Sequence, residues 1–397
     1  MALEGGFLGG SAGGSAGGSA GGSAGGSLGD AYASPLFAEA LNRSRDASID
    51  LDDRHPLWTL PSRNNAQDHK QFFRWEPWVR SYLVAQEALR LTDFRVECKD
   101  PKSKDDAELS VTFCVWEPNS GQWLDAATIV RPRRDVFEKQ ISKVLDWAEL
   151  RAERAAEILA QIDNQYPFWG SLIPIQCDRM RHTRELLDAA VQMSVFIEMR
   201  FKHELACWRP NDYSAQVQPM ITTPGHGSLP CGHCTQSHVI AEVLKALLNS
   251  MHPKAAYHSF NTQLGRLADR ISTNRVIAGL HFPVDNVAGR LLGSVLGEYF
   301  AYRCGGRPED SAVNPWNAGK FLGSEFKGET DFDPFHQPLV LKGASASAKV
   351  PDFYKFGLPT NARGKTVKVG SPAPSVLGVL WEKAKTECIE LGLRFEP

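Results

Sequence analysis

The stretch TPGHGSLPCGHCTQSH, residues 223–238, joins a loop rich in glycine and proline to the start of a helix. Apolar residues at helical spacing follow it from Val239 onward. Unpaired backbone amides at a helix start favour a bound anion, and Gly232 would let the backbone approach that anion closely. His233 would lie in the first turn, where its ring could exchange a proton. The stretch therefore predicts a helix whose N-terminus faces an oxyanion.

Four further helices are predicted around this one by apolar residues at spacings of three and four. They cover residues 135–162, 183–208, 255–271 and 283–300. Repeated amphipathic helices with short connections are typical of a bundle. We therefore expect an all-α fold, with a helical catalytic domain over residues 135–304.

The region before the bundle, residues 30–134, is expected to be an accessory region with short strands. Alternating apolar residues predict strands over residues 94–98, 111–116 and 123–130. The last two are joined by Glu-Pro-Asn-Ser-Gly, which has turn chemistry. A small N-terminal hairpin or sheet beside the bundle follows.

The two ends of the chain are expected to add little to the core. Residues 1–29 consist largely of a Gly-Gly-Ser-Ala repeat, which buries almost nothing and predicts a flexible linker or tag. Residues 305–397 are punctuated by glycine, proline and asparagine. They predict a loop-rich C-terminal extension with one helix near residues 376–391.

Composition narrows the classes of function. The chain has 397 residues, 42% of them hydrophobic, and a formal net charge of -2, so a core is expected but no nucleic-acid partner. No apolar run is long enough for a membrane span, and no secretory signal opens the chain. Eight cysteines in a chain this long do not make a disulfide scaffold. We expect a cytoplasmic protein.

The stretch KHELACWRP, residues 202–210, carries two cations. Lys202 and Arg209 stand nearly two helical turns apart, so on one helix they would share a face near the end that Pro210 imposes. Two cations at a helix terminus suit a tetrahedral oxyanion. Taken alone, the same pattern also fits a solvated basic edge.

The stretch NRVIAGLHFPVD, residues 274–285, adds Arg275 as a third permanent cation. His281 comes just before the helix that Pro283 starts, and Asp285 lies in the first turn of that helix. Asp285 could accept a hydrogen bond from one ring nitrogen of His281. That bond would fix the tautomer and leave the other nitrogen free to attack.

Together and in this order, the patterns KxxxxxxRP, PxGH and RxxxxxHxxxD resemble the type-two phosphatidic-acid-phosphatase and vanadium-haloperoxidase superfamily. The resemblance covers roughly residues 183–303 and implies a helical bundle. It also implies an oxyanion held by residues that we call the anion cage: Lys202, Arg209, Cys231, Gly232 and Arg275.

The resemblance implies three catalytic roles beside the cage. His281 would be the phosphate nucleophile, or the residue bonded to the metal if vanadate is bound. His233 would be the general acid-base group, and Asp285 would orient His281. One departure weakens the cage, because Cys231 stands where the family usually has serine, and a thiol is a poorer hydrogen-bond donor. Asn274 likewise replaces a serine but keeps a donor.

The pattern therefore predicts a phosphatase that hydrolyses phosphate monoesters without a cofactor. The alternative is a haloperoxidase that oxidises halide with hydrogen peroxide and needs vanadate. Short gaps between the three patterns and the thiols at the site favour the phosphatase. A second alternative is an anion-binding protein with a weakened site. The expected partners are the small-molecule substrates and a second copy of the chain, as a dimer.

Two other interpretations use the same residues. Cys231-Gly-His-Cys234 matches the redox motif of protein disulfide isomerase, although no βαβ pattern surrounds it. Cys231, Cys234 and His238, with His226 or His233, could also bind zinc. A zinc site would consume residues that complete the anion cage.

Overall fold

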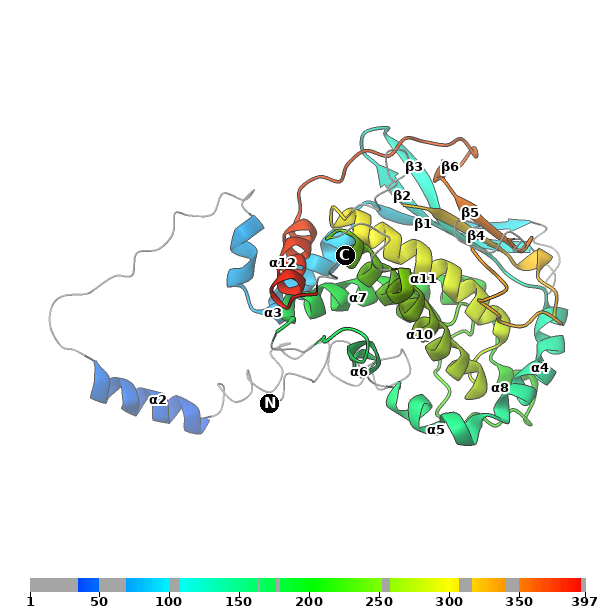
Figure 1. Cartoon of the computed structure of the whole chain (residues 1–397), viewed down its shortest axis with the longest axis horizontal. Helices are drawn as coiled ribbons and strands as arrows, with labels where there is room; N and C mark the ends of the chain where they lie inside the picture. The colour runs from blue at the N-terminus through cyan, green and yellow to red at the C-terminus, as the bar shows by residue number, and fades with distance from the viewer. Residues whose placement is uncertain are drawn as a thin grey trace.

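The computed structural model describes residues 35–49, 69–99, 108–162, 165–175, 179–251, 258–306, 316–339 and 350–393. Its centre consists of four long helices (Figure 1): α7 (Arg181–Leu205), α9 (Gly232–Asn249), α10 (His258–Ile277) and α11 (Pro283–Arg303). The helical positions predicted for this part of the chain are confirmed. The helix predicted over residues 135–162 is instead two helices, α4 (Arg134–Ala148) and α5 (Arg151–Ala160).

Helices α9 and α11 pack closely against each other, and this packing fixes the relative positions of their first turns. A Cβ atom on Gly289 would lie 2.8 Å from the Cys231 carbonyl oxygen, and one on Gly293 would lie 2.4 Å from the Thr235 carbonyl oxygen. Only glycine fits these two positions, which share one face of α11. The first turns of the two helices therefore lie side by side, and the Cys231 amide donates to the Asp285 carbonyl oxygen at 3.0 Å.

A six-stranded sheet covers one side of the helices (Figure 1). The predicted strands are confirmed as β1 (Thr92–Lys99), β2 (Glu108–Glu117) and β3 (Gln122–Val130), which form an antiparallel meander. The sheet packs on the helices through aromatic side chains. The ring of Phe113 lies 6.1 Å from that of Tyr299 on α11, centroid to centroid.

The prediction of an all-α fold with a loop-rich C-terminal extension is wrong in one respect, because that extension also contributes to the sheet. The segment after residue 304 supplies three strands of the sheet: β4 (Ala318–Leu322) pairs parallel to β3, β5 (Tyr354–Gly357) pairs with β4, and β6 (Thr360–Asn361) pairs with β3. Strands of two to five residues are too short to show an alternating pattern. They form because β3 and β4 offer open hydrogen-bonding edges.

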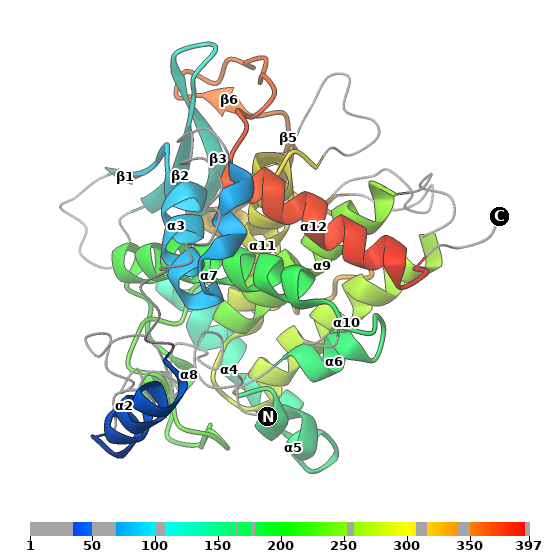
Figure 2. The same cartoon turned by 90° about the vertical axis from the view of Figure 1, so that its left-hand side faces the viewer.

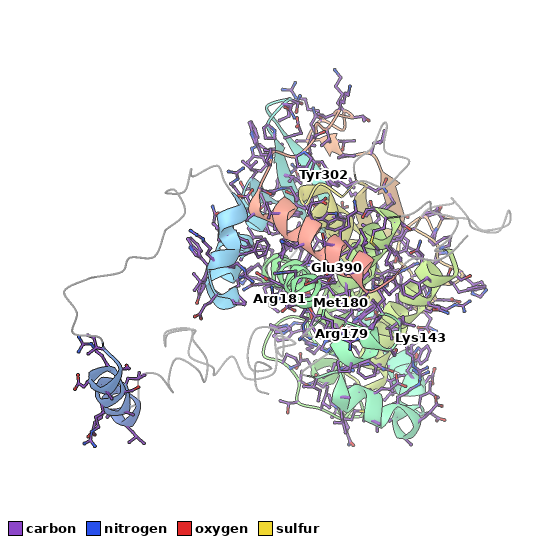
Figure 3. The ribbon with its side chains drawn as sticks, turned by 60° about the vertical axis from the view of Figure 1, so that its left-hand side comes forward. Lys143, Arg179, Met180, Arg181, Tyr302 and Glu390 are labelled. Carbon is purple, nitrogen blue, oxygen red and sulfur yellow. The ribbon has the colours of Figure 1, made fainter. Side chains whose placement is uncertain are left out.

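The predicted C-terminal helix is confirmed as α12 (Val376–Glu390), which crosses the start of α7 (Figure 2). Glu387 accepts hydrogen bonds from the backbone amides of His182 and Thr183, at 2.9 and 2.8 Å. A carboxylate there satisfies the unpaired first-turn amides of α7. Figure 3 labels Arg181 and Glu390 at this junction. The far end of the chain thus anchors the helix that carries Lys202.

The remaining elements are short: α2 (Pro35–Ser48), η1 (His69–Arg74), α3 (Pro77–Leu89), α6 (Tyr166–Gly170), α8 (Pro210–Tyr213) and η3 (Gly323–Glu325). No helix in the described ranges is long and apolar enough to cross a bilayer. The linker predicted over residues 1–29 lies outside the described residues. The domain boundaries drawn from the sequence, and the cytoplasmic location, stay predictions.

Candidate functional site

The three sequence patterns meet where α7 ends and where α9 and α11 begin. The Lys202 ammonium donates to the carbonyl oxygens of Gly227 and Ser228, at 3.3 and 3.1 Å, and also to that of Pro230. It therefore holds the loop that leads into α9. The Arg209 guanidinium reaches the third pattern, where its Nη1 lies 3.0 Å from Nε2 of His281.

The tautomer of His281 follows from its neighbours. Arginine can only donate, so the Nε2 atom that faces Arg209 must carry a lone pair rather than a proton. The proton is then on Nδ1, which donates to Oδ2 of Asp285 at 3.1 Å. Burial lowers the pKa of His281 well below its usual value, with the charge of Arg209 as the next cause. His281 is thus a neutral imidazole whose Nε2 lone pair accepts a hydrogen bond from Arg209.

Asp285 is fully buried and held by three donors through one oxygen. Its Oδ2 accepts from His281, from the Phe282 amide at 2.9 Å, and from the Ser228 hydroxyl. Burial raises the pKa of Asp285 to about 6, against the lowering effect of these hydrogen bonds. The contact with the amide of Phe282 caps α11, so one carboxylate fixes both the helix start and the ring of His281.

The spacing predicted that Arg209 and Lys202 share one helix face. This prediction is wrong, because Arg209 lies beyond the end of α7. α7 ends at Leu205, because Ala206 turns into the left-handed region with φ 49°. Arg209 is extended and begins the short helix α8, where its amide donates to Asp212 at 2.8 Å. Its guanidinium also donates to the carbonyl oxygen of His226 at 3.1 Å and to that of Leu280 at 2.9 Å. A turn of the chain, rather than helical periodicity, brings the two cations together.

Glu198 is a buried carboxyl group that the sequence reasoning missed. It lies one turn before Lys202 on α7, and its Oε1 accepts from the side-chain amide of Gln236 at 3.1 Å. Burial raises its pKa to about 7. Burial likewise lowers the pKa of Lys202 to about 8, and the charge of Arg209 adds to the effect. The spacing of four residues to Lys202 was the available signal.

Gly232 is the first residue of α9 and lies close to the Glu198 side chain. A Cβ atom at this position would lie 2.8 Å from Oε1 of Glu198. At a helix start its backbone amide has no carbonyl partner within the helix. Cys231 precedes it and is buried, and burial raises the pKa of the thiol to about 12. The thiol is therefore protonated at neutral pH.

His233 and Arg275 are joined through Gln161, another residue that the sequence reasoning missed. Nε2 of His233 donates to the Gln161 carbonyl oxygen at 2.9 Å, and Nη2 of Arg275 donates to Oε1 of the Gln161 side chain at 3.0 Å. Burial, and next the charge of Arg275, lower the pKa of His233 to about 3. Gln161 follows α5, more than a hundred residues before Arg275, so no local pattern pointed to it.

Arg275 is a buried cation with no ion-pair partner among the residues that the structure describes. Its side chain is 0% exposed, and Nε and Nη1 have no hydrogen-bond partner among the described residues. Nη2 alone is used, toward Gln161 and toward the Ile158 carbonyl oxygen at 3.3 Å. Burial lowers its pKa to about 10. Burying an unpaired charge is costly, so the arrangement suits a bound anion.

The two competing interpretations find little support in the geometry. Across the described ranges, no group of three or more histidine, cysteine, aspartate or glutamate side chains is placed to hold a metal ion. Cys231 and Cys234 are both free thiols at the start of α9, which packs among helices rather than in a βαβ unit. His238 instead pairs with Asp269 at 3.2 Å.

Comparison with known proteins agrees with this geometry. A family model described as the PAP2 superfamily matches residues 187–307. A vanadium-dependent bromoperoxidase from Ascophyllum nodosum is 27% identical over 114 residues, which are 23% of this chain and 20% of that protein. The chain therefore matches about a fifth of the length of this relative. The matched family segment contains all eight residues named for the anion cage and the catalytic roles.

Proposed function

Residues 187–307 are a PAP2 superfamily domain, and from this premise we propose that the chain is a phosphatase that hydrolyses phosphate monoesters. The nucleophile is His281, the general acid-base group is His233, and Asp285 orients the nucleophile. The anion cage holds the phosphoryl group. The sequence patterns and the contacts between them support this assignment.

The observation that carries the proposal is the unpaired charge of Arg275. Two of its nitrogen atoms are buried donors without an acceptor in the described part of the chain. Lys202 and Arg209 are also buried, and at least one carboxyl group nearby, that of Glu198, has a raised pKa. A site with this excess of buried donors gains most from a ligand that carries negative charge on several oxygens.

The reaction follows from the protonation states. The lone pair on Nε2 of His281 attacks phosphorus, and the bond from phosphorus to the leaving oxygen breaks. The Nδ1 proton stays on the ring and remains hydrogen-bonded to Asp285, whose negative charge stabilises the positive charge that the ring gains. The leaving oxygen takes a proton from His233. Water then attacks the phosphohistidine, gives a proton to His233, and the phosphorus–nitrogen bond breaks to release phosphate.

His233 must be protonated to act as the acid, although burial lowers its pKa to about 3. The second cause of that lowering is the charge of Arg275. A bound phosphoryl dianion offsets this charge and itself favours a positive ring. Substrate binding therefore raises the pKa of His233 and supplies the proton at the step that needs it.

The match to a bromoperoxidase favours a second candidate function, halide oxidation by hydrogen peroxide. The residues of the anion cage fit vanadate as well as phosphate, because the unpaired donors of Arg275 would meet its oxygens. His281 would be the residue that bonds vanadium. The bound vanadate would activate the peroxide. We place this candidate second because the short gaps between the three sequence patterns favour the phosphatase.

The test uses the purified full chain in two assays. The first follows p-nitrophenyl phosphate hydrolysis, and the second follows bromide oxidation with added vanadate and peroxide. Hydrolysis that is inhibited by vanadate and lost in His281→Ala supports the phosphatase. Bromide oxidation without hydrolysis would replace it with the second candidate. Tight phosphate binding without either turnover would leave an anion-binding protein and overturn both.

A further inference from the structure

Gln161 contacts two residues of the site that come from different helices. Its Oε1 accepts from Arg275 at the end of α10, and its backbone carbonyl accepts from His233 at the start of α9. Its side chain is 1% exposed. A residue in this position can act on the anion and on the acid-base group together.

The orientation of the Gln161 amide is fixed by its neighbours. Arg275 only donates, so the atom that faces it must be the oxygen. The Asn274 side-chain amide donates to the same oxygen at 3.0 Å. Asn274 is itself oriented by Arg154, whose Nη1 donates to Oδ1 of Asn274 at 3.3 Å. The other end of the Gln161 side chain is therefore the NH2 group, Nε2.

This NH2 group has no acceptor among the described residues and is buried. The same holds for Nε and Nη1 of Arg275, which touches Gln161. Two side chains in contact thus bury three nitrogen atoms that can only donate. An oxyanion satisfies such a set, whereas a metal ion would find no lone pair on it.

We propose that Gln161 is a further ligand of the bound oxyanion, with its side-chain NH2 donating to a phosphoryl oxygen beside Arg275. The inference rests on the proposed function and adds a neutral donor from outside the matched family segment. The Gln161 amide would also compensate for Cys231 in the anion cage, because a thiol is a poor hydrogen-bond donor and an amide is a good one.

Two substitutions separate the donor from the rest of the residue. Gln161→Glu keeps an oxygen for Arg275 and Asn274 but turns the NH2 group into a negatively charged acceptor. Gln161→Met keeps the length of the side chain but removes the donor together with the oxygen that accepts from Arg275 and Asn274. Both keep the backbone carbonyl that holds His233. We expect the dissociation constants of inorganic phosphate and orthovanadate to rise about 10- to 100-fold in Gln161→Met, and further in Gln161→Glu.

Gln337 offers a matched control, since it is also a buried glutamine but has both amide atoms satisfied. Its Oε1 accepts from the Asp333 amide at 3.1 Å, and its Nε2 donates to the Asp331 carbonyl oxygen at 2.7 Å. We expect Gln337→Glu to bind both anions as tightly as wild type. Thermal melts followed by circular dichroism without anion test whether each variant is folded. We expect the melting temperature of Gln161→Glu to be no lower than that of wild type.

The outcomes distinguish this inference from the function it rests on. Wild-type protein that binds neither phosphate nor vanadate overturns both. Wild-type binding that both Gln161 variants retain in full overturns the role of Gln161 alone. Equal losses in the variants of Gln161 and Gln337 would show a general effect of mutating buried glutamines, and would also overturn it. Should Gln161→Met fail to fold, Gln161→Glu decides the matter.

Discussion

Replacing Arg275 with methionine should affect the stability of the empty protein and its anion affinity very differently. The guanidinium buries two donors that have no partner in the described structure, and each costs about 1 to 3 kcal/mol. The substitution relieves that cost and loses the two hydrogen bonds of Nη2, to Ile158 and Gln161. We expect the free energy of unfolding without anion to stay within about 1 kcal/mol of wild type, or to rise.

Phosphate affinity should collapse in the same variant. Removing one partner of a buried ion pair typically costs about 3 to 5 kcal/mol, which corresponds to a loss of affinity of about 100-fold or more. Phosphate at a hundred times the wild-type dissociation constant should stabilise wild-type protein by about 2.7 kcal/mol. The same concentration should stabilise Arg275→Met by about 0.4 kcal/mol. Urea denaturation with and without phosphate measures both quantities.

Arg80 provides the matched control. It is also a buried arginine, but it makes a bidentate pair with Glu185 at 2.7 and 2.5 Å. Arg80→Met removes the arginine partner of Glu185 and leaves only His182 beside it in the described structure, at 3.8 Å, so we expect about 3 to 5 kcal/mol of lost stability and unchanged phosphate affinity. The reasoning fails if Arg275→Met is destabilised as much as Arg80→Met and still binds phosphate like wild type.

Three further predictions concern the neighbouring side chains. His281→Ala should abolish p-nitrophenyl phosphate hydrolysis and the phosphohistidine seen after acid-free quenching, while phosphate binding weakens only partly; retained turnover would exclude His281 as the nucleophile. Cys231→Ser should tighten phosphate binding and give equal or higher turnover, because a hydroxyl donates better than a thiol; lost activity would give the thiol a role of its own. His233 has a folded pKa of about 3, below its ordinary value of 6.5, so the unfolded chain binds more protons between these values. The stability that neutral His233 contributes is thus complete above pH 6.5 and is lost as the pH falls toward 3. We therefore expect the urea midpoint of His233→Ala to depend less on pH between these two values. An unchanged slope would contradict the low pKa.

The residues that the sequence could predict are those next to a helix boundary. Gly232 and His233 open α9, and Asp285 lies in the first turn of α11. Turn residues and prolines mark such boundaries locally, and unpaired backbone groups there attract charged side chains. The local structure was therefore readable from the same few positions to which the sequence assigns the predicted chemistry.

The residues that it could not predict depend on contacts between distant segments. Gln161 reaches Arg275 only because the end of α5 packs beside α10. Glu198 reaches Gly232 only because α7 packs beside the start of α9. The strand β4 is similar, because five residues form a strand only where β3 offers an edge. Each is a product of tertiary packing and has no periodic pattern of its own.

The contact between Arg209 and His281 bears on how the proposed nucleophile would be released for attack. Arg209 donates to the same Nε2 lone pair of His281 that must attack phosphorus. While that contact lasts, the lone pair is occupied and the charge of Arg209 helps to keep the ring neutral. A phosphoryl oxygen is a stronger acceptor for a guanidinium than a neutral imidazole is. On the proposed function, we expect a phosphoryl oxygen to compete with Nε2 for Arg209, which would free the lone pair of His281 for attack on phosphorus.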